Sequence, residues 1–184
     1  MTRISTSPRT RTPLIRFIKG RPVIFHNGQP VPEAGYSDYI TWSEDYEGRI
    51  REFARNGVRV FHVATHPGES AAFWGFPEAG AKIMRDWPSR LTICRQVEII
   101  LKFCPDALLF IRPSSTVDKA WAERYPHDMQ TDEDGKRYAD ATLASPRYLQ
   151  HVTRFFQRLV NHCESQPWGD RIVGYLDAPY GEGT

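Results

Sequence analysis

The chain has 184 residues, of which 40% are hydrophobic and 12% aromatic, which is enough to bury a core and excludes a wholly disordered chain. Its formal net charge is only +2, with 24 basic residues mixed among 22 acidic ones, which argues against a nucleic-acid-binding face. No apolar run approaches the roughly 20 residues of a membrane span, and the start has no apolar signal-peptide core. We therefore expect a soluble protein, with the cytoplasm as the favoured compartment.

The first segment, residues 1–13, combines arginines with Ser, Thr and Pro and has no acidic residue. This composition predicts a flexible basic arm, and an organelle transit peptide is the alternative. Between Leu14 and Val31, Asn27-Gly28 separates two short apolar runs. Because Asn-Gly readily adopts the positive φ angles of a type I′ turn, this stretch predicts a β-hairpin.

Helices and strands alternate along the rest of the chain. Thr41 and Glu44 form a capping-box pattern before a helix that ends at Asn56-Gly57, and the β-branched run 58–65 predicts a buried strand. The segment 66–88 is too long for a simple connector and is either a functional loop or a locally folded insertion.

The second half repeats this order. Ser89 is the expected cap of a second helix that Pro105 closes, and residues 107–112 predict the next strand. A second long connection has a short helical piece around Trp121 and a turn at Asp134-Gly135. Ser145-Pro146 then starts a long helix, and a final strand opens at Arg171. Three cysteines lie in apolar helical patterns and predict reduced core thiols: Cys94, Cys104 and Cys163.

This order of elements predicts an α/β fold with a parallel sheet and right-handed crossovers. The long loops follow the strands and the short ones precede them, which fits a (β/α) barrel and also an open doubly wound sheet. No Gly-rich phosphate-binding pattern follows any predicted strand, which favours the barrel.

Several motifs resemble the amino-terminal half of the catalytic barrel of glycoside hydrolase clan A, closest to family 42 β-galactosidases. They are FARNGVRVFHV at 53–63, Arg112-Pro113, AWAERYP at 120–126, TDEDGKR at 131–137, SPRY at 145–148 and Gly174-Tyr175. The resemblance implies a partial TIM (β/α)8 barrel over residues 14–184, roughly strands 1 to 4 with their helices, preceded by the β-hairpin. A complete barrel needs roughly 250 residues, so we expect a truncated chain that is inactive alone.

The same resemblance implies an acid/base glutamate after strand four and a nucleophile after strand seven. Retaining chemistry needs these carboxyl groups about 5–5.5 Å apart. Glu182 matches the acid/base, and Asp177 is the fallback. The nucleophile would lie in the missing half, and no cofactor is implied.

Sugars are bound by aromatic rings and fixed polar groups. The resemblance implies that Arg112 holds a catalytic carboxylate by a bidentate pair, with a structural ion pair as the alternative. The aromatic candidates have loop packing as their alternative role. The candidate substrate-binding residues are Arg112, Trp121, Tyr125, Trp74, Tyr36, Tyr39 and His62.

Two other functions stay open. One is a noncatalytic carbohydrate-binding or scaffold protein derived from such a barrel. The other is a metal-dependent hydrolase, because His62 and His66 end a strand, although their spacing of four is not that of two ligands on one face of a strand. We expect a carbohydrate substrate, no nucleic acid, no membrane, and self-association through the edges of an open sheet.

Overall fold

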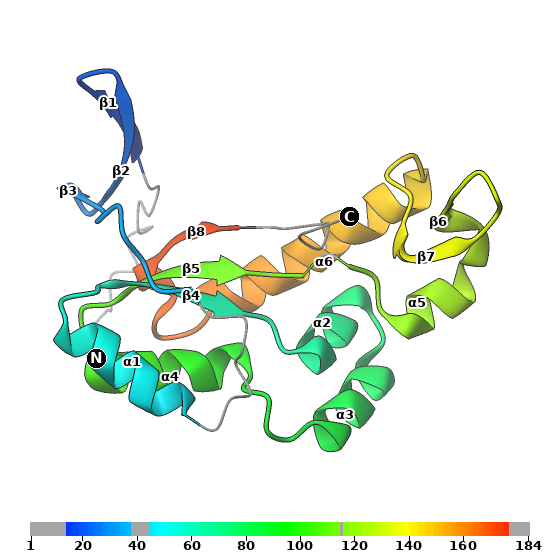
Figure 1. The fold of residues 1–184 in the computed structure, drawn as a ribbon, viewed down its shortest axis with the longest axis horizontal. Helices are drawn as coiled ribbons and strands as arrows, with labels where there is room; N and C mark the ends of the chain where they lie inside the picture. Colours follow the sequence, from blue (N-terminus) through cyan, green and yellow to red (C-terminus); the bar gives the residue numbers. More distant parts are fainter. Residues whose placement is uncertain (1–13, 38–44, 115, 177–184) are drawn as a thin grey trace, which may run out of the picture.

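The computed structural model describes residues 14–37, 45–114 and 116–176 (Figure 1). The strands are β1 (Leu14–Ile18), β2 (Arg21–His26), β3 (Gln29–Pro30), β4 (Val60–Ala64), β5 (Leu108–Arg112), β6 (Met129–Thr131), β7 (Arg137–Ala141) and β8 (Ile172–Tyr175). The α-helices are α1 (Tyr46–Arg55), α2 (Pro67–Trp74), α3 (Pro77–Asp86), α4 (Ile93–Phe103), α5 (Lys119–Arg124) and α6 (Pro146–Glu164). Two short 3₁₀ helices are η1 (Pro126–Asp128) and η2 (Gly169–Arg171). None of these helices is long and apolar enough to cross a membrane.

A parallel sheet with the order β4-β5-β8 forms the centre of the molecule. Tyr36 makes an isolated parallel bridge to Phe61, so a further segment lies on the free side of β4. The predicted parallel sheet is confirmed, with neighbouring strands in the order of the chain. Over the residues that the structure describes, the strands do not close into a barrel.

The two faces of this sheet are covered differently. Side chains on one face of β4 and β5 are fully buried beneath the helices: Phe61, Val63, Leu109 and Ile111. On the opposite face, Val60 and Val173 pack with Val31 near the amino ends of the strands. His62 and Phe110 lie farther along this face and are only partly buried. The helix-covered face therefore carries the main core.

The predicted hairpin is present, with a second turn that the sequence analysis missed. Asn27 and Gly28 have φ angles of 49° and 79°, as a type I′ turn requires. Lys19 and Gly20 have similar angles, 51° and 79°, and connect β1 to β2. Every residue of β1 is exposed, and the hairpin projects away from the helices (Figure 1).

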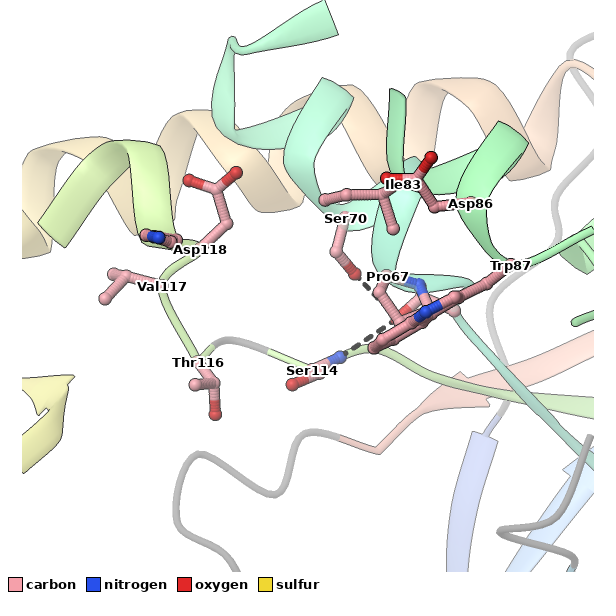
Figure 2. A pocket seen from close by; sticks show the side chains of 11 residues that line it. Pro67, Ser70, Ile83, Asp86, Trp87, Ser114, Thr116, Val117 and Asp118 are labelled. Atoms are coloured by element: carbon pink, nitrogen blue, oxygen red, sulfur yellow. Dashed lines mark hydrogen bonds between the residues drawn. The ribbon is translucent and has the colours of Figure 1, made fainter. Parts of the chain in front are cut away.

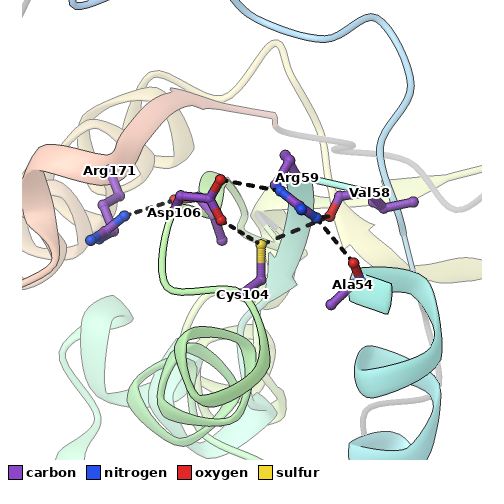
Figure 3. Close-up of polar contacts among 7 residues, drawn as sticks. Ala54, Val58, Arg59, Cys104, Asp106 and Arg171 are labelled. Atoms are coloured by element: carbon purple, nitrogen blue, oxygen red, sulfur yellow. Dashed lines mark hydrogen bonds and ion pairs between the residues drawn. The ribbon is translucent and has the colours of Figure 1, made fainter. Parts of the chain in front are cut away.

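Three polar side chains connect the short turn between α1 and β4 with the short turn between α4 and β5 (Figure 3). We call them the amino-end cluster: Arg59, Cys104 and Asp106. The Arg59 guanidinium donates to the carbonyls of Ala54 and Val58 at 3.0 and 2.9 Å and to Asp106 at 3.1 Å. The Cys104 thiol donates to Asp106, and burial raises its pKa to about 11. All three cysteines are free thiols, and Cys104 and Cys163 are buried, as predicted.

The helix starts agree with the sequence in part. Ser145 caps α6 by accepting the Tyr148 N–H, as predicted. The prediction of Ser89 as the cap of α4 is wrong. Thr92 is the cap, because its hydroxyl accepts the Arg95 N–H, and the helix begins at Ile93. Thr41 and Glu44 lie outside the described residues. Residues 66–88 form a locally folded insertion of two helices, α2 and α3.

Candidate functional site

A pocket of about 390 Å³ opens where β4 and β5 end, between the two insertions that follow them (Figure 2). The segment after β4 contributes Thr65 and Ser70, and Trp87 comes from the residue just after α3. The segment after β5 contributes Ser114 and Asp118. Because the carboxyl ends of parallel strands are where α/β proteins place ligands, this pocket is the candidate site, and we call it the carboxyl-end pocket.

Thr65 joins the two walls of the pocket. Its hydroxyl oxygen accepts from the Ser70 hydroxyl at 2.9 Å and from the Ser114 N–H at 3.2 Å. Its own N–H donates to the Arg112 carbonyl at 3.2 Å, which continues the pairing of β4 with β5. The rim of the pocket is therefore built directly on the parallel sheet.

Trp87 supplies an aromatic surface. Its side chain is 48% exposed, and the Arg90 guanidinium lies over the ring at 4.2 Å from the centroid. Its carbonyl lies 3.3 Å from Nε2 of the buried His66. The ring of Trp87 is therefore exposed, whereas its backbone carbonyl contacts a buried side chain.

Two carboxylates border the same space. Asp118 caps α5 by accepting the Trp121 N–H at 2.9 Å. Burial raises the pKa of its carboxyl group, and that hydrogen bond opposes the shift. Asp86 ends α3 on the opposite wall and is exposed. Together with the hydroxyls of Thr65 and Ser70, these groups can accept or donate hydrogen bonds to a polyhydroxyl ligand.

Three of the predicted sugar-binding rings lie elsewhere, in an aromatic cluster of α2, α5, α6 and the residue that follows α5. This cluster consists of Trp74, Trp121, Tyr125, Tyr148, His151 and Phe155. Trp121 is fully buried, and its indole N–H donates to His151 Nδ1 at 3.0 Å. Trp74 is 5% exposed and stacks on Phe155 with centroids 5.0 Å apart. Their burial favours the packing role over a sugar platform.

Tyr125, in the same cluster, packs against both Trp121 and His151, and the Arg147 guanidinium lies over its ring at 4.7 Å. The Tyr36 ring lies 4.3 Å from Phe53, and its hydroxyl accepts from Arg49 at 3.1 Å. Neither tyrosine borders the carboxyl-end pocket.

His62 and Arg112 lie on the sheet itself. The His62 ring packs 5.4 Å from Phe110 on the less covered face, where burial lowers its pKa. Arg112 is the last residue of β5 and lies next to the pocket-lining segment. The buried His66 ring instead faces Gly68 and Trp87, so the two histidines have separate surroundings.

Glu182, Asp177 and Tyr39 lie outside the described residues. Within residues 14–37, 45–114 and 116–176, no three His, Cys, Asp or Glu side chains come together as metal ligands would. Sequence reasoning missed Trp87 and Asp118. Their signals were a Trp-Pro pair that ends the first insertion and an aspartate just before a short helix.

No protein-family model matches the chain, and a search of curated proteins finds no match. Among solved structures, the β-galactosidase from Bacillus circulans sp. alkalophilus is similar at a TM-score of 0.46 with 16% sequence identity. The similarity covers 79% of this chain and 21% of that enzyme, so the chain spans about a fifth of its length. At this TM-score the likeness carries no argument about function, and the case for a function rests on the carboxyl-end pocket.

Proposed function

We propose that this chain is the sugar-binding, amino-terminal part of a retaining O-glycosyl hydrolase of β-galactosidase type, inactive alone. One observation carries the proposal: the carboxyl-end pocket combines the exposed Trp87 ring with the hydroxyls of Thr65 and Ser70 and the carboxylates of Asp86 and Asp118. It lies at the edge of the parallel sheet where catalytic residues of barrel enzymes are found.

The chemistry of the pocket suits a pyranose. The C–H face of a sugar ring is apolar and packs on an indole, whereas its hydroxyls need acceptors and donors in fixed positions. Thr65 already accepts two hydrogen bonds, so its own proton can be donated to a sugar hydroxyl. Asp86 and Asp118, on the two walls of the pocket, can accept hydrogen bonds from sugar hydroxyls.

The proposed architecture is the first four strands of a (β/α) barrel. Three observations support it: the parallel order β4-β5-β8, the parallel bridge of Tyr36 on the far side of β4, and the main core of described residues between the helices and one face of the sheet. The less covered face, with His62 and Phe110, would then face the barrel interior. The remaining strands would come from outside this chain.

In the proposed mechanism, Glu182 is the acid/base and Asp177 the fallback. The protonated carboxyl group gives its proton to the leaving oxygen, while a nucleophilic carboxylate from outside this chain, about 5–5.5 Å from the acid/base carboxyl group, attacks the anomeric carbon. Arg112, at the end of β5, would orient a catalytic carboxylate by a paired hydrogen bond.

A noncatalytic carbohydrate-binding role is the second candidate. It is favoured by one feature of the pocket: its ring, hydroxyls and two carboxylates all come from residues 65–118, so these binding groups are present without Glu182. Binding alone therefore does not require the acid/base.

The test is titration with methyl β-galactoside, followed by NMR of the labelled chain. We expect weak saturable binding, which Trp87→Ala weakens by about tenfold or more, as the loss of an aromatic anchor does. Tyr138→Ala removes an equally exposed ring on β7, away from the pocket, and should bind as the unmodified chain does. No binding by the unmodified chain, or equal losses in both variants, would refute the sugar-binding pocket.

Hydrolysis of p-nitrophenyl β-galactoside tests whether the chain has a complete catalytic pair or only the part of the site that binds sugar. We expect the chain to bind this substrate without turning it over. Turnover that Glu182→Gln abolishes would contradict the assignment of the nucleophile to a region outside the chain.

A further inference from the structure

His66 lies directly below the wall formed by Trp87. It caps α2 at the end of β4 and is only 2% exposed. Its Nδ1 accepts the Gly68 N–H at 2.8 Å, so Nδ1 carries no proton. The ring proton must then be on Nε2, which donates to the Trp87 carbonyl at 3.3 Å. One neutral imidazole thus connects the start of α2 to the backbone of the pocket wall.

The segment 87–93 is held at its first residue by His66 and at its last residue by Glu69. The Glu69 carboxylate accepts the His66 N–H at 3.1 Å and the Ile93 N–H at 3.0 and 3.2 Å. The start of α4 is therefore fixed to the start of α2. Between these two attachments lie residues 87–93, and the Trp87 ring projects from them into the carboxyl-end pocket.

We propose that His66 is a positioning residue for Trp87, a role that rests on the proposed function of the pocket. The hydrogen bond from Nε2 fixes the Trp87 backbone and hence the ring on which the sugar would lie. The arrangement requires a neutral imidazole, because a proton on Nδ1 would face the Gly68 N–H donor. A proton on Nδ1 leaves the Nε2 donor in place but turns the Gly68 contact into two opposed N–H groups, which displaces the ring from the position where it holds Trp87. Acid should therefore loosen Trp87 indirectly, through the loss of the Gly68 contact.

The surroundings of His66 favour the neutral imidazole on balance. Burial lowers the pKa of His66, the Trp87 carbonyl opposes this shift, and the Arg90 guanidinium adds to it. Because the pKa is lower in the folded chain, its contribution to stability is present above the ordinary value of about 6.5 and is lost as the pH falls through the folded value.

Glu69 titrates in the opposite sense. Burial raises its pKa to about 6, so its contribution is full below its ordinary value and is lost as the pH rises through about 6. The other groups near this carboxylate are the Cys94 thiol of α4, the Cys163 thiol of α6 and the His162 ring of α6. From α3, Gly80 and Met84 line the adjoining surface and do not titrate.

The decisive variant is His66→Asn. Asparagine is a favoured N-cap and can still accept the Gly68 N–H, but it is too short to reach the Trp87 carbonyl. His127→Asn, at an exposed histidine of η1, is the matched control. Trp87→Phe isolates the Trp87 fluorescence by difference, and acrylamide quenching then reports how freely that indole moves, without any sugar.

In the unmodified chain and in His127→Asn, we expect quenching of Trp87 to increase as the pH falls from 7.5 to 5. His66→Asn should show the high quenching at every pH, with the pH dependence lost. Its affinity for methyl β-galactoside at pH 7.5 should fall about fivefold, the effect of one lost hydrogen bond.

Equal quenching in His66→Asn and His127→Asn at pH 7.5 would overturn the positioning role, whether or not sugar binds. If His66→Asn does not fold, a flat pH response of Trp87 in the unmodified chain overturns it as well. If quenching responds as expected and the unmodified chain binds no sugar, the positioning role stands and the proposed function of the pocket fails.

Discussion

The two ends of the parallel sheet are built for different tasks. At the carboxyl ends, two folded insertions enclose a pocket with an exposed indole, hydroxyls and carboxylates. At the amino ends, the returns are short, the amino-end cluster joins α1 to β4 and β5, and Val31 packs across the strand starts. The pocket and the contacts that fasten helix to sheet therefore lie at opposite ends of the strands, the arrangement typical of α/β proteins with parallel sheets.

The largest expected effect is in the aromatic cluster that supports the carboxyl-end insertions. Trp121→Ala should lower the free energy of unfolding by about 3–5 kcal/mol, because it removes a fully buried ring and leaves a cavity. The measurement is urea denaturation followed by circular dichroism. Trp87→Ala is the matched control, and at an exposed position it should change stability by less than about 0.5 kcal/mol.

A loss of similar size in both variants would mean that Trp87 belongs to the core and would remove the contrast between buried and exposed tryptophans. Trp121→Phe should lie between them. It keeps most of the ring contacts but loses the 3.0 Å hydrogen bond to His151.

A smaller effect is expected at the amino-end cluster. Arg59→Ala should cost about 1–2 kcal/mol, because two carbonyls at the junction of α1 and β4 lose a charged donor. Asp106→Ala should cost less than about 0.5 kcal/mol, since its ion pair with Arg59 is largely exposed to solvent. Thermal unfolding with Arg55→Ala as an exposed control measures both.

If Asp106→Ala destabilised the chain as much as Arg59→Ala, the ion pair rather than the backbone carbonyls would be the main fastening. In that case the loss should shrink at high salt, because exposed charge pairs are screened.

The sequence predicted local features well and long-range ones poorly. Asn27-Gly28 and Ser145-Pro146 were predicted correctly because their own conformations and hydrogen bonds determine a turn or a helix start. The parallel strands followed from β-branched runs that alternate with helical patterns. Trp121 and Trp87 look alike in sequence, and only the packing of α6 against α2 and α5 buries the first and leaves the second exposed.

The same limit applies to the site. The segment 66–88 was interpreted as either a functional loop or a locally folded insertion, and the carboxyl-end pocket lies between this folded segment and the connection that follows β5. The particular residues could not be read from the chain, because Thr65 and Asp118 meet across the pocket from segments more than 50 residues apart. His66 was weighed as a metal ligand, whereas its partners are the Gly68 N–H and the Trp87 carbonyl.

The smallest effect on stability is expected in the β1–β2 hairpin, where we propose that a second copy covers the exposed strand. Within the described residues β1 pairs only with β2, and the Phe17 side chain is 75% exposed. Phe17→Ser should change the free energy of unfolding by less than about 0.5 kcal/mol, because the ring has little to lose on unfolding. It should nevertheless weaken self-association in sedimentation equilibrium, whereas Leu143→Ser, at another exposed apolar residue, should not.

Salt adds a second test of the same surface. The hairpin carries Arg16, Lys19 and Arg21 and no acidic residue, so two hairpins that pair along β1 bring like charges together. Added salt screens this repulsion and should strengthen self-association of the unmodified chain. A monomer at every salt concentration would mean that the exposed strand is not covered by a second copy. Association that weakens with salt would instead indicate contact between the basic hairpin and an acidic surface.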